Sequence, residues 1–211
     1  VAPDNGIGTV SLPAACPYVN EGGTLNIVEG LPLGTTIECD YQIDSFFDVF
    51  TEIGGPMGGE MIEFGAIMHL HMMGTGDMSG FLRDIDLPLS VIEYTAPRIP
   101  GELIQEFGCE LGDLMGQITG DPDFDLLRLT AGDSHGLPAP GGTTLTRLPD
   151  GRWNVDSFFD ITYRIDFVGA PGGMLAGLSG TTTTPAPVRT HQGEDGWDHC
   201  GAFDITLDGM G

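Results

Sequence analysis

Asp44-Ser45-Phe46-Phe47-Asp48 returns letter for letter as Asp156-Ser157-Phe158-Phe159-Asp160. The residues before the two copies also correspond, because Gly34-Thr35-Thr36-Ile37 precedes the first and Gly142-Thr143-Thr144-Leu145 precedes the second. Self-similarity of this kind indicates that one structural unit has been duplicated within the chain.

Both copies alternate with a period of two, which predicts β-strands with one buried face. In the second copy the predicted core face is Val155, Ser157, Phe159, Ile161, Tyr163 and Ile165. In the first copy it is Ile43, Ser45, Phe47, Val49, Thr51 and Ile53. Runs of this type are separated by turns rich in the 34 glycines and 15 prolines of the chain. We therefore predict an all-β protein with little helix, an antiparallel β-sandwich of jelly-roll or Greek-key type built from the duplicated unit.

Four parts are expected along the chain. They are an N-terminal arm (1–22), a first β-unit (23–95), a second β-unit (96–190) packed with the first as one globular body, and a C-terminal tail (191–211). Residues 103–118 fit a strand or a short amphipathic helix, and glycines at 108, 112 and 116 favour the strand. In the tail, residues 201–207 alternate and form a candidate last strand, pairing within the chain or with a neighbour.

The charge of the chain restricts its partners. Seven Arg and no Lys stand against 31 acidic residues, which gives a net charge of −24. Nucleic acids and anionic membranes are excluded as default partners because they require the opposite sign. No apolar run approaches the ~20 residues of a membrane span. The absence of Lys also removes Schiff-base chemistry.

Four cysteines with wide spacing predict two disulfides in an oxidising compartment. Of the three connectivities we prefer Cys16–Cys39 and Cys109–Cys200; the alternative is four buried thiols in a cytosolic protein. Because the chain begins with Val1, we expect a removed signal peptide. The expected location is extracellular, at the cell surface or in the periplasm.

The strongest site pattern is His69-Leu70-His71. On a strand the two imidazoles lie on one face, at a distance suited to sharing a transition metal with a third ligand such as His191, His199 or an Asp. The alternative is a pair of solvated surface histidines.

Asp121, Asp123 and Asp125 have the alternating oxygens of a calcium loop, although Leu126 and Gly132 stand where an EF-hand requires Gly and Glu. The alternative is a solvated acidic turn. No cofactor is required by the sequence, and calcium or a transition metal is the candidate.

Phe46, Phe50 and Phe158 fall among acids on the predicted outer face. They predict either an interface with another subunit or coverage by a loop or third layer.

A catalytic site is not expected. Residues 132–136 match G-x-S-x-G, but the proline-rich sequence that follows cannot form the required helix.

Three functions fit these observations. The leading one is a secreted, non-catalytic structural protein, a filament or surface-layer subunit that assembles with itself by β-strand addition. The second is a secreted carbohydrate- or metal-binding module, with Tyr94, Trp153 and Trp197 as an aromatic platform for sugars. The third is a metal-dependent enzyme that uses His69 and His71.

Overall fold

A computed structural model describes residues 1–21 and 23–192 of the chain. The candidate strand at 201–207, Trp197, His199 and Cys200 lie outside these residues.

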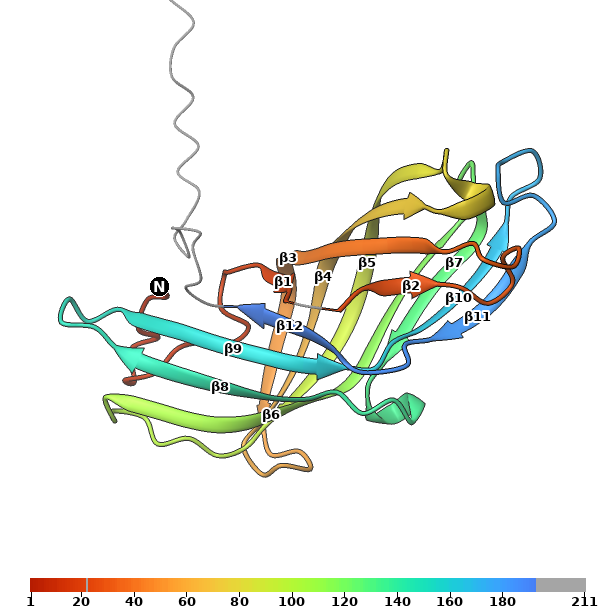
Figure 1. Cartoon of the computed structure of the whole chain (residues 1–211). Helices are drawn as coiled ribbons and strands as arrows, with labels where there is room; N and C mark the ends of the chain where they lie inside the picture. The colour runs from red at the N-terminus through yellow and green to blue at the C-terminus, as the bar shows by residue number, and fades with distance from the viewer. Residues whose placement is uncertain (22, 193–211) are drawn as a thin grey trace, which may run out of the picture.

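Figure 1 shows an elongated all-β molecule with β8 and β9 towards one end and β7, β10 and β11 towards the other. Its strands are β1 (Tyr18–Asn20), β2 (Leu25–Ile27), β3 (Ile37–Ile53), β4 (Glu60–Gly74), β5 (Leu82–Thr95), β6 (Ile104–Thr119), β7 (Phe124–Ala131), β8 (Pro140–Arg147), β9 (Trp153–Ile161), β10 (Arg164–Gly169), β11 (Ser179–Thr183) and β12 (Val188–Gln192).

Eight of these strands close into an antiparallel β-barrel, so the predicted β-sandwich is wrong. The order around the ring is β6-β5-β4-β3-β1-β12-β9-β8, and β8 pairs again with β6. Alternation along a strand indicates that one face of the strand is buried. Strands of a β-sandwich and strands of a β-barrel both have one buried face. The two folds differ in whether the sheet has free edges, and this depends on pairings between distant parts of the chain.

The sheet forks at β6. Along one edge of this strand, residues 104–110 pair with β8 and residues 114–119 pair with β7. β7 continues through β10 to β11, while β2 pairs with the start of β3. β6 therefore belongs both to the closed ring and to the extension beyond it. Residues 103–118, for which a short helix was the alternative, thus form a strand, as predicted.

The far end of the extension returns to β2. Thr182 Oγ1 accepts hydrogen bonds from the backbone N–H groups of Val28 and Glu29, at 3.1 and 3.0 Å. Gly30 and Gly180 make this approach feasible, because a Cβ atom at either position would lie about 2 Å from a backbone oxygen of the other segment.

The second copy of the repeat has the predicted orientation. Ser157, Phe159 and Ile161 are buried in β9 and Tyr163 follows them into the core, whereas Asp156 is exposed. β9 is paired on both sides, by β8 and β12. A regular ladder on each edge keeps the period of two intact.

The first copy is different, and the predicted core face of β3 is wrong beyond Ile43. Ser45 and Asp48 have positive φ angles of 55° and 51°, and the β3–β4 register shifts on both sides of Phe47. Each bulge changes which side chains point inward. As a result Phe46 packs against Tyr18 and Phe64, while Phe47, Val49 and Ile53 are exposed.

Helical structure is limited, within the described residues, to two 3₁₀ turns, η1 (Gly76–Met78) and η2 (Asp133–His135). No helix in that part of the chain is long and apolar enough to cross a membrane. The N-terminal residues pack on the ring: Ala2 bridges to Trp153, and Val10, Leu12 and Ala14 are buried.

Candidate functional site

The first candidate site is the open edge of β3, which we define as residues 44–53. β1 pairs with Gln42 and Ile43, and β2 pairs with residues 37–39. Within the described chain, β3 beyond this point has only β4 as a strand partner. The backbone N–H and C=O groups on its other side can therefore accept an additional strand.

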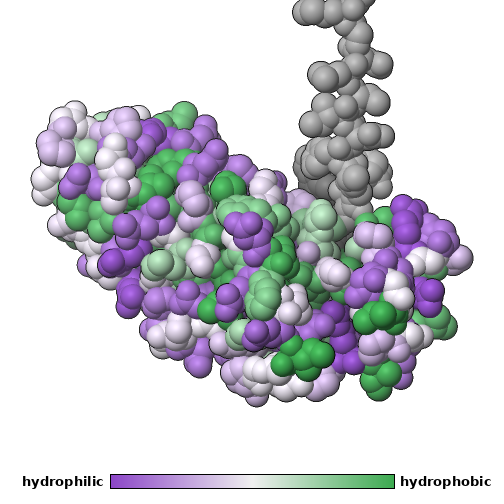
Figure 2. All heavy atoms as spheres, turned by 180° about the vertical axis from the view of Figure 1, so that it is seen from behind, coloured by the Kyte–Doolittle hydropathy of each residue, from purple (hydrophilic) through white to green (hydrophobic). Residues whose placement is uncertain are grey.

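Apolar side chains gather along the open edge. Phe47, Val49, Phe50 and Ile53 are 44, 47, 53 and 96% exposed. Phe47 lies over Gly65 of β4, where a Cβ atom would come within 2.2 Å of its ring. Figure 2 shows, on the face turned away in Figure 1, hydrophobic patches scattered among hydrophilic groups, some at its lower border. Exposed apolar residues on an unpaired edge are a feature of interaction sites.

The three phenylalanines predicted as an interface do not form one surface. Phe46 packs towards the core, Phe50 is exposed on the open edge, and Phe158 lies half-buried on β9. The apolar surface on β3 consists instead of Phe47, Val49, Phe50 and Ile53.

The second candidate site is a groove of about 960 Å³ on the outer face of the ring. Its base is a cross-strand row in which Gly108 of β6 pairs with Gly142 of β8, and Gly142 pairs with Phe158 of β9. Neither glycine carries a side chain that could fill the space above the sheet, and the Phe158 ring lies over Gly142, where a Cβ atom would be 3.3 Å from it.

Arg189 of β12 closes one side of the groove. Its guanidinium lies 4.3 Å from the centre of the Phe158 ring and donates two hydrogen bonds to Asp160, at 2.8 and 2.7 Å. His191 Nε2 is 3.0 Å from Asp156 Oδ1. The second copy of the repeat thus supplies Asp156 and Phe158 to the lining of the groove, and its Asp160 accepts the hydrogen bonds of Arg189.

The other side of the groove is polar and has fewer internal contacts. Glu106 pairs across the ladder with Thr144, and Thr144 pairs with Asp156. Within the described chain, the side chains of Glu106, Thr144 and Asn154 form no hydrogen bond. Such groups are available to bind a polar ligand. Sequence reasoning missed this site, because bringing Glu106 and Asn154 to the same groove depends on the β6–β8–β9 register.

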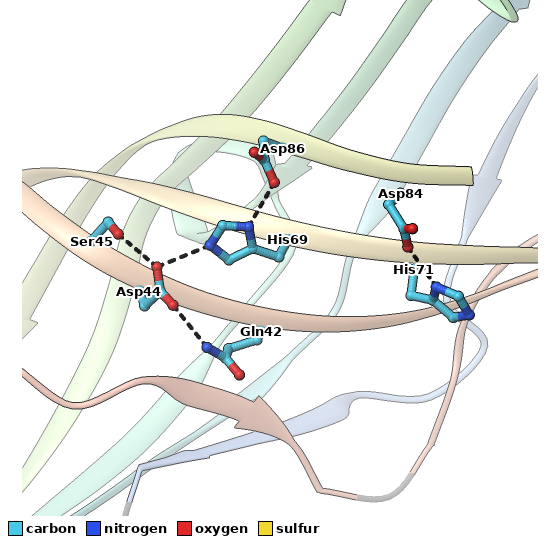
Figure 3. A network of polar contacts seen from close by, with 7 residues as sticks. All are labelled: Gln42, Asp44, Ser45, His69, His71, Asp84 and Asp86. Carbon is cyan, nitrogen blue, oxygen red and sulfur yellow. Dashed lines mark hydrogen bonds and ion pairs between the residues drawn. The ribbon is translucent and has the colours of Figure 1, made fainter. Parts of the chain in front are cut away.

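His69 and His71 lie on the same exposed face of β4, as predicted, but each is held by carboxylates of neighbouring strands (Figure 3). His69 Nδ1 is 2.6 Å from Asp86 and its Nε2 is 3.0 Å from Asp44. His71 Nδ1 is 2.6 Å from Asp84. These contacts connect β3, β4 and β5 on the outer surface.

The protonated form of His69 is favoured here. The hydrogen bond to Asp86 raises the pKa of His69, partial burial opposes this, and Asp44 adds to the increase. Burial also acts against ionisation of Asp44, but hydrogen bonds from Ser45, Gln42 and His69 lower the pKa of that carboxyl group. The geometry is that of a cross-strand ion pair.

The structure does not bring a set of metal ligands together at either predicted metal site within the described residues. Among residues 1–21 and 23–192, no group of three or more His, Cys, Asp or Glu side chains is arranged to hold a metal ion. Arg83 forms ion pairs with Asp121 and Asp123, the first two acids of the predicted calcium loop, and Asp125 is exposed. Asp121 also accepts the N–H groups of Asp123 and Phe124, as in an acidic turn.

Both predicted disulfide pairings are wrong. Cys39 and Cys109 are free, buried thiols, and no two cysteines of the described chain are joined. Cys39 lies in the core of β3, and Cys109 contacts Thr143 at 3.3 Å. Cys16 is disulfide-bonded, but its partner is neither Cys39 nor Cys109, because both of these thiols are free.

A polar network crosses the interior of the ring. Glu93 of β5 is 2% exposed, and burial is the main reason that its pKa is raised to about 7, with Cys109 and Arg98 acting in the opposite direction. Cys109 continues through Thr143, Ser157 and Tyr18, with hydroxyl distances of 2.9 and 3.0 Å. The network joins five strands, which indicates a structural role.

The predicted aromatic platform for sugars is not assembled. Trp153 is completely buried and its indole N–H donates to Asp4 at 3.0 Å. Trp197 lies outside the described residues. Residues 132–136 do not form a nucleophile–base pair either, because Ser134 and His135 both contact Asp113, at 2.6 and 2.7 Å.

Comparison with known proteins adds no assignment: no protein-family model, curated protein sequence or solved structure matches the chain significantly. The function therefore has to be argued from the sites themselves.

Proposed function

We propose that the protein is a secreted structural protein that assembles with copies of itself through the open edge of β3. The observation that carries this proposal is a strand segment with one strand partner and four exposed apolar side chains. Addition of a strand would satisfy the free backbone groups and would cover Phe47, Val49, Phe50 and Ile53.

Two features favour controlled assembly over general aggregation. The bulges at Ser45 and Asp48 interrupt the regular edge, so few registers of an added strand can pair with it. Asp48 and Glu52 are exposed carboxylates on the same segment, and charges on an edge oppose unspecific pairing. The partner must therefore match both the shape and the charge of the edge.

The test is light scattering with negative-stain microscopy on the oxidised full-length protein. We expect concentration-dependent oligomers or filaments. Substitution of Phe50→Ser together with Ile53→Ser should abolish them. Leu33→Ser is the matched control, because Leu33 is fully exposed in the loop before β3 and its replacement should leave assembly unchanged.

A wild-type protein that stays monomeric at high concentration would refute the proposal. Equal loss of assembly in the Leu33→Ser control would refute the assignment to β3.

The groove supports a second candidate function, a binding module for neutral oligosaccharides. Its volume of about 960 Å³ falls in the range of small-ligand sites. Asp156, Thr144 and Asn154 offer the acceptors and donors that sugar hydroxyls use, and the net charge of the chain disfavours polyanions.

Calorimetry with a panel of neutral oligosaccharides tests this candidate. We expect Asp156→Asn combined with Asn154→Ala to remove the binding heat. Asp84→Asn, an exposed carboxylate on β5, is the control for the change in charge. No heat with any member of the panel would count against the candidate.

A further inference from the structure

We propose that the groove on the outer face of the ring selects oligosaccharides that carry amino groups, and that Glu106 recognises the ammonium group. The inference rests on the second candidate function, an oligosaccharide-binding module, and names the class of sugar. It does not depend on self-assembly through β3.

The charges that line the groove are mostly negative. Its carboxylates are Glu21, Glu106 and Asp156, and among the described residues Arg189 is its one guanidinium. That guanidinium is already bonded to Asp160, so it adds little positive charge to the open space. In a molecule with a net charge of −24, a groove of this sign concentrates cationic ligands.

The three carboxylates differ in the partners that they already have. His191 lies between two of them, with Nε2 3.0 Å from Asp156 and Nδ1 4.0 Å from Glu21. Glu106 is exposed, and in the described part of the chain its side chain has no hydrogen bond or ion pair. Glu106 is therefore the carboxylate of the groove that is open to a cationic partner.

The register of the sheet places two further acceptors beside Glu106. Glu106 of β6 pairs with Thr144 of β8, and Thr144 pairs with Asp156 of β9. Directly opposed residues point to the same side of a sheet, and the Cα atoms of the two acids are about 10 Å apart. An ammonium group has three N–H donors. Two carboxylates with a hydroxyl oxygen between them supply three acceptors, which matches that number.

The surroundings of these acceptors suit a sugar better than an isolated amine. Asn154 lies two residues before Asp156 on the same face of β9, and its amide is free, within the described chain, to bond to hydroxyl groups. The groove of about 960 Å³ also holds more than one ammonium group. Because the chain contains no Lys, no side chain of a second copy can supply an ammonium group.

Calorimetry on the full-length protein with two matched oligomers tests the inference. The tetramer of N-acetylglucosamine is neutral, and the tetramer of glucosamine has the same length and linkage but one amino group on each unit. At about pH 5.5, where amino groups are protonated, we expect the glucosamine tetramer to bind about tenfold more tightly. The ratio of the two affinities should fall as sodium chloride is added, because salt screens exposed charges.

A variant of Glu106 supplies the second readout. Glu106→Gln keeps the shape of the side chain and removes its charge, so the ratio of the two affinities should fall to about twofold or less. Glu63→Gln is the control, because Glu63 is an exposed carboxylate of β4 outside the groove. This control should keep the ratio of wild type.

The outcomes separate the inference from the binding module itself. Equal affinity of wild type for the two tetramers, or an unchanged ratio in Glu106→Gln, would refute the inference and leave the module standing. No binding heat with either tetramer would refute the inference and count against the module. A lysine tripeptide that binds as tightly as the glucosamine tetramer would also refute the inference, because the amine alone would then be recognised.

Discussion

Glu93 is a carboxyl group inside the ring, and its ionisation opposes folding. Burial raises its pKa from the ordinary value of 4.5 to about 7. Below pH 4.5 the group is neutral in the folded and the unfolded chain. Between pH 4.5 and about 7 the folded chain binds more protons at Glu93 than the unfolded chain does. The contribution of Glu93 to stability is therefore lost as the pH rises through 7.

Glu93→Gln should remove this pH dependence. A shift of this size corresponds to roughly 3 kcal/mol between pH 4.5 and 8, so wild type should lose up to about that much more stability than the variant over this interval. Urea denaturation at both pH values measures the difference. Glu63→Gln, an exposed carboxyl on β4, is the control; the same pH profile for wild type and Glu93→Gln would contradict the prediction.

At His69 the expected effect is on protonation. Asp86→Asn replaces the carboxylate that contributes most to the raised pKa, so the pKa of His69 should fall in an NMR titration. Asp84→Asn removes the partner of His71 and should affect His69 less. If the pKa of His69 is the same in wild type and Asp86→Asn, the assignment of Asp86 as its main partner is wrong.

At the scale of elements, one pentapeptide has two structures. In β9 it is a regular strand, and in β3 it contains two residues with positive φ. Asp48→Gly should therefore raise the free energy of unfolding by up to about 1 kcal/mol, because glycine adopts positive φ without strain. Asp160→Gly should lower it by about 1 kcal/mol or more, because Arg189 loses its partner.

Chemical denaturation of the two variants measures this contrast. Equal effects at Asp48 and Asp160 would show that the bulges do not determine the local conformation.

The repeat also shows what the sequence could predict. Alternation correctly predicts that both copies are strands and which face of β9 is buried. The placement of glycines correctly predicts that residues 103–118 are extended. The bulged form of 44–48 does not, since the same letters form a regular strand elsewhere. The difference comes from neighbours: β9 is paired on both edges, whereas β3 loses β1 and β2 at Ile43. The groove could not be predicted either, because its residues are brought together by the pairing of β6, β8 and β9.

At the scale of the whole molecule, the net charge of −24 should control assembly. Asp48 and Glu52 are exposed on the open edge of every copy, so like charges oppose contact between copies. Salt screens exposed charges over about 10 Å at 0.1 M ionic strength. Association measured by sedimentation should increase from low to high sodium chloride, and a decrease would indicate that ion pairs hold the assembly.

Closure of the barrel also limited the sequence-based prediction. Alternation identifies strands and their buried faces, but the pairings of β6 with β8 and of β1 with β12 determine whether the sheet closes. Neither pairing leaves a local pattern in the residues concerned. A sandwich and a barrel were therefore indistinguishable from periodicity, and the duplicated pentapeptide favoured the wrong one.

The pairing of Val19 with His191 has a consequence for the order of folding. Joining residues so far apart costs more chain entropy than forming the hairpins of β3 to β6, and folds with distant contacts form slowly. During synthesis, β1 is complete long before β12 leaves the ribosome. In that interval the edge of β1 that later pairs with β12 remains accessible. Chains made close together can exchange strands during this interval, before either barrel has closed.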